Sequence, residues 1–402
     1  MSLLADLKVD GRFPPVEMRI TPLVSRTPQR NAPVKSLVID KFINYSFNNS
    51  MLIPVDNFSY SFSAPSDEKS FTEYVLEGDL VSLHAKNICI GTGIVDQIEI
   101  ECDGDSGEKV TVNGRNLLGQ LEDQAAVSID MKPIYLQNIK AEDAVKKLIE
   151  GTRLPREIIT QDVTNIISLI QTQPGETKLN AILRFLEPLN CLCWSSPEGR
   201  LVVGKPNFGQ KALGKLMVSK SKRSSNVLSI RVTRSAASIA SRVVAVWTSA
   251  ELNVQQATAQ NKVFENKAEG PSRLLNNGHS VTKVYVSSIA NGGDAAGGDE
   301  VSRLKVAKQA DVTLLAQEAF RMMARDNFNE ILVTCIVAGH YNEQGQPYVT
   351  DTIYNIEYDR AGLSENMYLY SVEYSGDVNR GQWTTLNFCR VNTIVHGAKI
   401  NA

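Results

Sequence analysis

The chain has 402 residues, of which 43% are hydrophobic and 21% are charged, and its formal net charge is −2. This length suggests two to four domains, and the composition is that of a folded globular protein, neither disordered nor fibrous. Apolar runs such as Val243 to Trp247 are far shorter than the roughly 18 residues that a membrane-spanning helix needs. Asp6, Asp10 and two prolines occupy the place of a signal peptide's apolar stretch, so we do not expect secretion by that route.

The first part of the chain has the pattern of a β-domain. Residues 1–30 contain four prolines and little periodicity, which predicts an arm or tether. Three aromatic residues then occur two apart, at Phe58, Tyr60 and Phe62, and therefore lie on one face of a strand. The run Asp103-Gly-Asp-Ser-Gly107 reverses the chain into a second strand and predicts a hairpin. Short strands with regular turns favour a small antiparallel barrel or sandwich.

A helical pattern follows after Asp123. Apolar residues at helical spacing from Ala141 to Ile149 end near Gly151, which suits a helix C-cap. A second helix is predicted after Thr177, a suitable N-cap residue, and is ended by Pro188. The segments 191–194 and 200–203, separated by a Ser-Ser-Pro-Glu-Gly turn, predict a hairpin that completes a compact α/β unit.

The last part of the chain is again rich in β pattern, with one helix predicted to begin at Asp311. Residues 251–310 are polar and glycine-rich in part, and we expect a long loop or excursion there. No repeat is visible at the level of residues, so any similarity between the two β-rich parts is expected to be architectural. The predicted strands are Val227–Val232, Arg242–Trp247, Ile331–Ala338, Tyr348–Tyr358, Met367–Tyr374 and Thr384–Cys389.

The sequence contains no recognisable reactive constellation. It lacks a phosphate-binding loop, a dinucleotide fingerprint and a nucleophile elbow, and its four histidines are widely scattered. Cys191 and Cys193 have no second Cys/His pair nearby, so we interpret them as two thiols on opposite faces of a strand. Asp103 and Asp105 are interpreted as a polar turn, since the calcium-loop spacing is absent. We therefore predict no enzyme activity and no catalytic, cofactor-binding or metal-binding residue.

Charge is distributed unevenly along the chain. Residues 31–126 hold 15 acidic and 6 basic residues, whereas residues 200–242 hold 10 basic residues and no acidic one. Three interpretations of the basic segment remain open. It forms a phosphate-tracking surface, it faces the acidic first domain of a neighbouring subunit, or it is a solvated linker.

Several motifs, taken in chain order, resemble one family. They begin with Val112-Asn-Gly-Arg-Asn116 and continue with Gln173-Pro-Gly-Glu-Thr177 and its helix. The hairpin 194–203, the strand 227–234 and the helix 310–321 follow. Over about residues 31–395 this order is similar to that of Mu-type phage tail hub proteins, which are related to the hub part of type VI secretion spikes. The length of 251–310 and the basicity of 200–242 depart from the family pattern and leave the loop contacts open.

The resemblance implies a β-rich α+β fold in which two tail-tube-like antiparallel β-barrel domains flank a small α/β domain. Within that fold, Gly114 is expected to serve backbone conformation and Arg115 a buried charge-assisted contact. The implied domains are an N-terminal arm (1–30), a first barrel (31–126), the α/β domain (127–206), a second barrel (207–395, with the excursion 251–310 and a helix at 311–326) and a tail (396–402).

The implied function is that of a structural baseplate hub. Three chains would present six similar barrels, so that a threefold object docks on a sixfold tube and lines the DNA channel. Implied partners are the tail tube protein, a separate central spike protein and the baseplate wedge proteins, with the tape-measure protein as a further candidate. DNA would pass without sequence-specific contact, and no stable membrane association is expected. The implied location is the virion baseplate, after assembly in the host cytoplasm.

Three alternatives remain open. The first is a hub of a type VI secretion-like or pyocin-like injection machine. The second is a multi-barrel nucleic-acid-binding module that uses residues 200–242. The third is a cell-wall hydrolase, for which the sequence gives no support.

Overall fold

The computed structural model describes residues 16–22, 37–63, 75–103, 107–128, 130–161, 163, 166–187, 189–219, 225–235, 242–248, 254–260, 282–286 and 319–395. Within these ranges, no helix combines the length and the apolar character that crossing a membrane requires.

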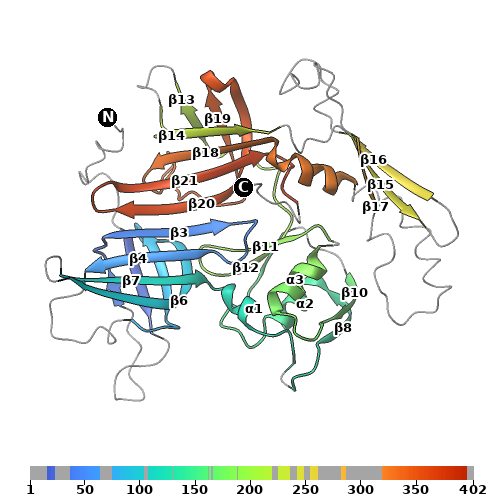
Figure 1. Cartoon of the computed structure of the whole chain (residues 1–402), viewed down its shortest axis with the longest axis horizontal. Helices are drawn as coiled ribbons and strands as arrows, with labels where there is room; N and C mark the ends of the chain where they lie inside the picture. Colours follow the sequence, from blue (N-terminus) through green and yellow to red (C-terminus); the bar gives the residue numbers. More distant parts are fainter. Residues whose placement is uncertain are drawn as a thin grey trace.

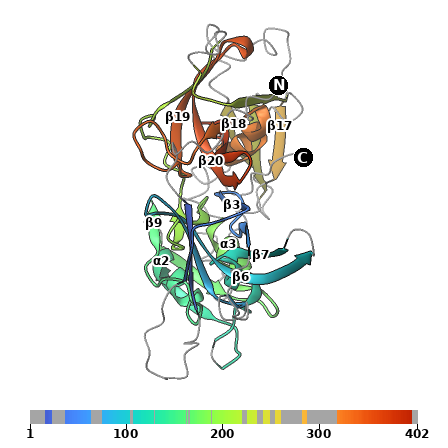
Figure 2. The ribbon, with the colours of Figure 1, turned by 90° about the vertical axis from the view of Figure 1, so that its left-hand side faces the viewer.

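Thirteen strands form one continuous sheet that curves into two modules (Figures 1 and 2). The two modules meet where β3 of the first pairs with β20 of the second. The first module contains β1 (Val16–Thr21), β2 (Leu37–Ile39), β3 (Asn44–Ser50), β4 (Asn57–Ser63), β5 (Leu80–Ala85), β6 (Ile88–Asp103) and β7 (Gly107–Asn116). The second contains β13 (Lys215–Val218), β14 (Ser229–Arg234), β18 (Ile331–Ala338), β19 (Thr352–Tyr358), β20 (Leu363–Asp377) and β21 (Gly381–Arg390), with short 3₁₀ turns η6 (Phe328–Glu330) and η7 (Asp359–Ala361).

The two modules repeat the same topology. The sheet order is β3-β4-β7-β6-β5-β1 in the first and β14-β18-β21-β20-β19-β13 in the second, with the strands following the same order along the chain. The ladder of β6 with β7 shifts between Val95 and Gln97, and that of β20 with β21 shifts between Leu369 and Ser371. Adding 274 converts 95 to 369 and 97 to 371, so the two irregularities occupy equivalent places. One difference is that β1 pairs antiparallel with β5, whereas β13 pairs parallel with β19.

The prediction of two antiparallel β-barrel domains is confirmed in part: the chain has two β-rich modules, but the described strands do not close into barrels. They form one open sheet shared by both modules, and the β13–β19 pair is parallel. Because β3 pairs with β20, its outer edge is not available to close the first module on itself. In the second module the outer edges of β13 and β14 have no partner among the described strands. Residues 16–21, expected in an arm or tether, form β1 and pair with both β5 and β2, with Val16, Met18 and Ile20 buried.

A small α/β domain lies beside the first module (Figure 1). It contains β8 (Tyr135–Lys140), α2 (Ala141–Leu148), β9 (Ile159–Gln161), β10 (Ile166–Gln171), α3 (Lys178–Leu186), β11 (Leu192–Ser195) and β12 (Leu201–Gly204), and it follows the short helix α1 (Gly119–Asp123). The predicted N-cap is confirmed, because the Thr177 hydroxyl accepts a hydrogen bond from the Asn180 amide. The C-cap residue of α2 is Ile149, and Gly151, with φ +83°, lies two residues beyond it in the turn that follows. Contacts such as Thr92 Oγ1 donating to Pro197 O, at 2.8 Å, attach the domain to the first module.

The thiols of Cys191 and Cys193 lie together in the core of the α/β domain, with Leu201 and Val203. The expectation that they lie on opposite faces is wrong, because residues two apart on a strand point the same way. The intervening Leu192 faces a different core cluster.

Within the expected excursion 251–310, two segments form strands. β16 (Val254–Gln260) pairs antiparallel with β15 (Arg242–Thr248), and β17 (Thr282–Val286) pairs with the same strand in parallel. The rest of 251–310 lies outside the described residues, as do positions 311–318 of the predicted helix. Residues 319–327 are helical, which agrees with the later part of that prediction.

One apolar core runs through both modules, and aromatic rings of β3 pack directly over glycines in it. A Cβ atom at Gly376 would lie 2.3 Å from the Tyr45 ring, and one at Gly91 would lie 2.1 Å from the Phe47 ring. Real Cβ atoms do not approach carbon so closely, so these glycines make room for the rings. The prediction that Phe58, Tyr60 and Phe62 share a buried face is confirmed.

We therefore expect Gly376→Val to displace the Tyr45 ring and lower the free energy of unfolding by about 1–3 kcal/mol, the usual cost of overpacking. Ser364→Ala, an exposed change in the same strand, is the matched control and should alter it by less than about 0.5 kcal/mol. Urea unfolding measures both. Equal stability of the two variants would contradict the packing argument.

Candidate assembly surfaces

The described residues contain no reactive cluster. No group of three or more His, Cys, Asp or Glu side chains among them is arranged to hold a metal ion. Burial raises the pKa of the thiols of Cys193, Cys335 and Cys389 to about 12, which keeps them protonated and unreactive. His84 and His340 lie in different surroundings, while His279, His396 and Asp105 lie outside the described residues.

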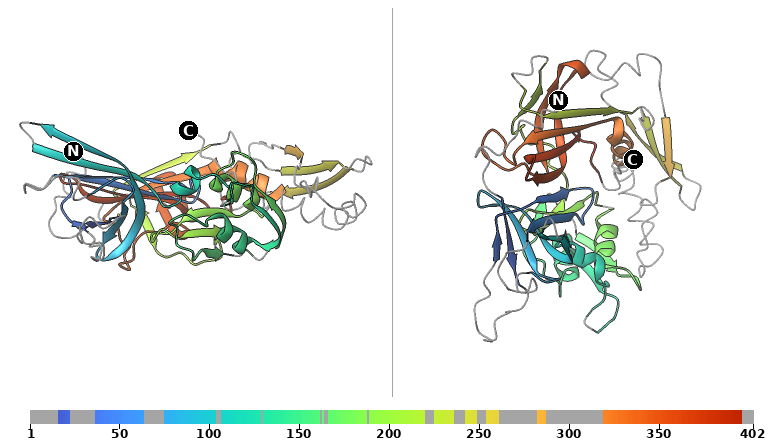
Figure 3. Two further views of the ribbon diagram at one scale, coloured as in Figure 1. Left: turned by 90° about the horizontal axis from the view of Figure 1, so that it is seen from below. Right: turned by 60° about the vertical axis from the view of Figure 1, so that its left-hand side comes forward.

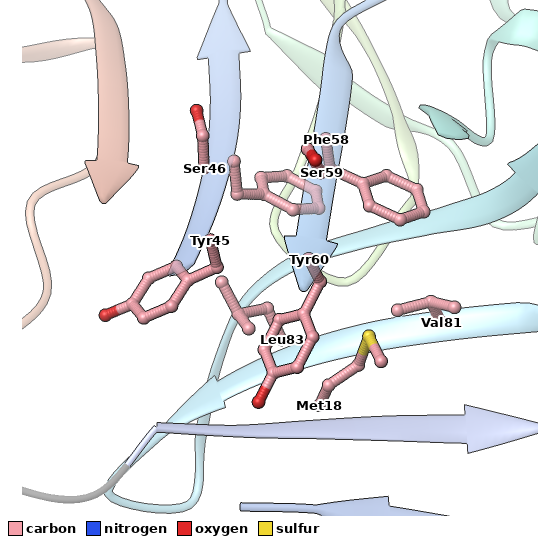
Figure 4. Close-up of a pocket in the computed structure, with 9 residues that line it drawn as sticks. Met18, Tyr45, Ser46, Phe58, Ser59, Tyr60, Val81 and Leu83 are labelled. Carbon is pink, nitrogen blue, oxygen red and sulfur yellow. The ribbon is translucent and has the colours of Figure 1, made fainter. Parts of the chain in front are cut away.

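The interior of the first module is filled by its own side chains (Figure 4). Tyr45, Phe58, Tyr60, Met18 and Leu83 converge there from four strands and leave a cavity of only about 10 Å³. That volume is no larger than one water molecule requires, so the interior offers no room for a substrate. A larger pocket of about 530 Å³ lies against residues 37–43, Phe62, Ser63 and Val378. The other surfaces available for function are the strand edges and outer faces.

The seam between β3 and β20 is the first of these edges. Seven pairs run from Ser371 opposite Ser50 to Asp377 opposite Asn44. The ladder is extended at both ends, because Met51 N donates to Tyr370 O at 3.0 Å and Val378 N donates to Ile43 O at 2.9 Å. On the outer face, the Ser46 hydroxyl donates to the Glu373 carboxylate at 3.0 Å. The seam thus joins strands that lie 327 positions apart in the sequence.

A buried chain of hydrogen bonds crosses the seam on its core face. The Thr384 hydroxyl donates to Gly339 O at 2.6 Å, so its oxygen accepts from His340 Nδ1 at 2.9 Å. His340 Nε2 is then the unprotonated nitrogen, and it accepts from the Tyr45 hydroxyl at 2.5 Å. Every polar side-chain atom in this chain of hydrogen bonds therefore has a partner of the correct kind. Burial lowers the pKa of His340 to about 3, so the ring is neutral at physiological pH.

The end of the seam is held by a buried carboxyl. The Asp56 side chain is only 6% exposed and accepts from Ser50 N at 2.8 Å, while its own carbonyl accepts from Asn116 N. These bonds fix the turn between β3 and β4 against the end of β7. Burial raises the pKa of the Asp56 carboxyl from 3.8 to about 7, with the Ser50 hydrogen bond opposing this shift.

The resemblance implied a backbone role for Gly114 and a buried charge-assisted contact for Arg115. The structure gives each residue a role that differs in part from this expectation. A Cβ atom at Gly114 would lie 2.0 Å from Ile94 O and 2.6 Å from the Phe58 ring, so glycine is needed for close approach; its φ is not positive. Arg115 makes paired bonds to Asp96 and to Asp123, at 2.8–3.1 Å, which raise its pKa. The charge-assisted contact is confirmed, but the side chain is 29% exposed rather than buried.

Other strand edges are open within the described part of the chain, among them one edge of β6 and one of β14. The second half of β6, residues 97–103, extends beyond β5, which pairs with β6 only as far as Ile94. Figures 2 and 3 show this half, with β7, projecting from the body of the first module. At the other end of the sheet, β14 pairs with β18 alone.

The described residues of the basic segment 200–242 are distributed over several strands. They run from β12 through β13 and β14 into β15. Two of its cations pair with acids of the same chain: Lys215 with Glu357 at 2.7 Å, and Arg200 with Glu157 at 3.5 Å. Arg231 and Arg234 lie exposed on β14.

Comparison with known proteins identifies the fold. No protein-family model matches the sequence, and no curated protein matches it. Solved structures do match. A tail protein from Neisseria meningitidis MC58 has 17% identity and a TM-score of 0.68, and the match covers 94% of this chain and 98% of that one. The 43 kDa tail protein of prophage MuSo2 from Shewanella oneidensis has 15% identity, the same coverage and a TM-score of 0.69.

A more distant match is an Escherichia coli component of the type VI secretion system that is described as structurally similar to T4 bacteriophage tail proteins. It has 10% identity and a TM-score of 0.52, with 96% of this chain and 79% of that chain covered. The chain therefore has the fold of phage tail proteins over nearly its whole length, which confirms the structural side of the resemblance. At these identities the shared property is the fold.

Tyr45→Phe should lower the free energy of unfolding by about 1–3 kcal/mol, because it leaves His340 Nε2 buried without a donor. Tyr135→Phe removes a hydroxyl from an exposed tyrosine and is the matched control, with an expected change below about 0.5 kcal/mol. Urea unfolding at pH 7 measures both. If the free energy of unfolding falls by the same amount in both variants, the chain of hydrogen bonds does not stabilise the seam.

Asp56→Asn should stabilise the protein increasingly as pH rises from about 4 to 7. In this window the folded wild type holds a proton on Asp56 that the unfolded chain releases, so wild-type stability falls by up to about 1.4 kcal/mol per pH unit. Asparagine has no such dependence. His340, whose lowered pKa has the opposite effect, is present in both proteins and cancels in the difference. A difference between the two unfolding free energies that does not change from pH 4 to pH 7 would contradict the buried, protonated carboxyl.

Proposed function

We propose that the protein is a structural baseplate hub of a contractile phage tail. Three copies form a ring that adapts the sixfold tail tube to a threefold central spike and surrounds the DNA channel. The observation that carries the proposal is the duplicated topology: two equivalent modules in one chain, joined edge to edge by β3 and β20. Three such chains present six equivalent modules, which is what a threefold ring needs in order to meet a sixfold tube.

The same proposal assigns the partners of the protein and its location. Partners of the ring are the tail tube protein on one side, a separate spike protein on the other, the wedge proteins around it and the tape-measure protein in the channel. DNA passes without sequence-specific contact. The protein acts in the virion baseplate, in a structural and not an enzymatic role.

The same architecture also suits a hub of a type VI secretion-like or pyocin-like injection machine. The match to the Escherichia coli type VI secretion component, over 96% of this chain, favours this as the second candidate. Both candidates share the ring of three and differ in the particle that contains it.

The purified protein should have a mass of about 133 kDa in solution, three times the 44.2 kDa of one chain. Mass photometry or light scattering measures it. Electron-microscopic class averages viewed along the ring axis should show six lobes of similar size, related in pairs by threefold symmetry. A monomer at all concentrations, or a ring of another order, would refute the hub.

A further inference from the structure

The β3–β20 seam uses one strand edge from each module, and in each case the equivalent edge of the other module stays unpaired among the described residues. Within the chain, the second half of β20 pairs with β3. The equivalent of that half-strand is β6 residues 97–103, and the equivalent of β3 is β14. Neither has a partner on the corresponding side among the residues that the structure describes. β2 and β13 are also outer strands, but neither has a counterpart in the β3–β20 seam.

The equivalence extends to single residues. Tyr45 of β3 pairs with Tyr60, which pairs with Val112. Ile230 of β14 pairs with Cys335, which pairs with Leu386. Val112 and Leu386 are related by the offset of 274 that aligns the two irregularities, so Ile230 occupies the place of Tyr45. The same comparison gives Val232 the place of Phe47. Phe47 pairs with Phe58, which pairs with Gly114. Val232 pairs with Val333, which pairs with Phe388, and 114 and 388 again differ by 274.

We propose that β6 residues 97–103 of one copy pair antiparallel with β14 of a second copy, in the register of the β3–β20 seam. The inference rests on the assembly proposed above and identifies the strands that hold neighbouring copies together. Tyr374 lies opposite Phe47 in the seam, and subtracting 274 gives Ile100 opposite Val232. Ser375 lies opposite Ser46, which gives Glu101 opposite Arg231.

The apolar face of this pairing is complementary. Ile100 is 51% exposed, whereas its equivalent Tyr374, covered by β3, is 1% exposed. Ile230 and Val232 pack only partly against the main core from the outer strand β14. In the proposed register these side chains meet Cys102 and Ile100, so that apolar residues of both copies extend the core across the contact.

The polar face is complementary in charge. Glu101 already pairs with Lys109 on β7 at 3.0 Å, and a second copy places Arg231 on its other side. Arg231 has no ion pair with another described residue, and Glu99 lies on the same face as Glu101. This arrangement selects one of the three interpretations of the basic segment 200–242: part of it faces the acidic first module of a neighbour.

The contact is head to tail, because each copy gives β14 to one neighbour and β6 to the other. Such contacts close into a ring when the rotation per copy allows it. Ring closure leaves neither of these two edges open, which removes a site for uncontrolled strand pairing.

A disulfide cross-link tests the register. Met51 N donates to Tyr370 O and Val378 N donates to Ile43 O, so Met51–Tyr370 and Ile43–Val378 are hydrogen-bonded pairs of the antiparallel ladder. Hydrogen-bonded and non-hydrogen-bonded pairs alternate along such a ladder, which makes Ser46–Ser375 a non-hydrogen-bonded pair. The Glu101–Arg231 pair inherits this geometry, with Cα atoms about 4.5 Å apart, within the range of a disulfide. The full chain carrying Glu101→Cys and Arg231→Cys, with the exposed Cys102 changed to Ala, should give under mild oxidation bands of two and three chains and none larger.

The controls are Glu101→Cys combined with Ser229→Cys or with Thr233→Cys, which would cross-link only if the register slipped by two residues. A protein of trimer mass that does not cross-link at 101–231, or that cross-links better in a control, overturns the register and leaves the hub proposal standing. A wild-type protein that remains a monomer overturns both proposals.

Charge reversal gives a second measurement. Arg231→Glu places a third acid beside Glu99 and Glu101 and should shift the mass in solution from three chains to one. Arg360→Glu makes the same change at an exposed site on η7 and should keep three chains. A trimer that persists in Arg231→Glu would overturn the pairing. Unchanged circular dichroism in both variants shows that the monomers are folded.

Discussion

The pairing of β3 with β20 is the constraint on which the rest of the structure depends. It joins the first and last thirds of the chain, and it turns two modules into one sheet with one core. Backbone hydrogen bonds supply the ladder, but they are not selective for partners. Selectivity comes from the side chains on the core face, where Tyr45 requires Gly376 for space and His340 as an acceptor. The second module is therefore held in one register relative to the first.

Local features of this fold are accessible from sequence because they depend on neighbours in the chain. Alternating aromatics predicted β4, the capping residue Thr177 predicted the start of α3, and the glycine at 151 predicted the end of the preceding helix. Each depends on the geometry of a few consecutive residues. The same local logic correctly applied would have placed Cys191 and Cys193 on one face.

The features that define the candidate assembly surfaces are non-local, and the sequence does not reveal them. Gly376 and Tyr45 are separated by most of the chain, and neither carries a signal of its partner. The duplication is equally hidden, since equivalent positions hold Val112 and Leu386, or Tyr45 and Ile230, which share apolar character but not identity. The family resemblance implied two barrel domains, and only the β3–β20 pairing shows that they share one sheet.

The irregularity at Asp96 in β6 and at Tyr370 in β20 divides each long strand into two halves with different neighbours. β20 therefore belongs to both modules as one covalent strand, with β19 along its first half and β3 along its second. A pull along the strand axis loads all seven β3–β20 pairs at once, in shear, so that they must break together and not one after another. A strand shared in this way transmits force between modules without a hinge, and the pair of modules behaves under load as one stiff arc.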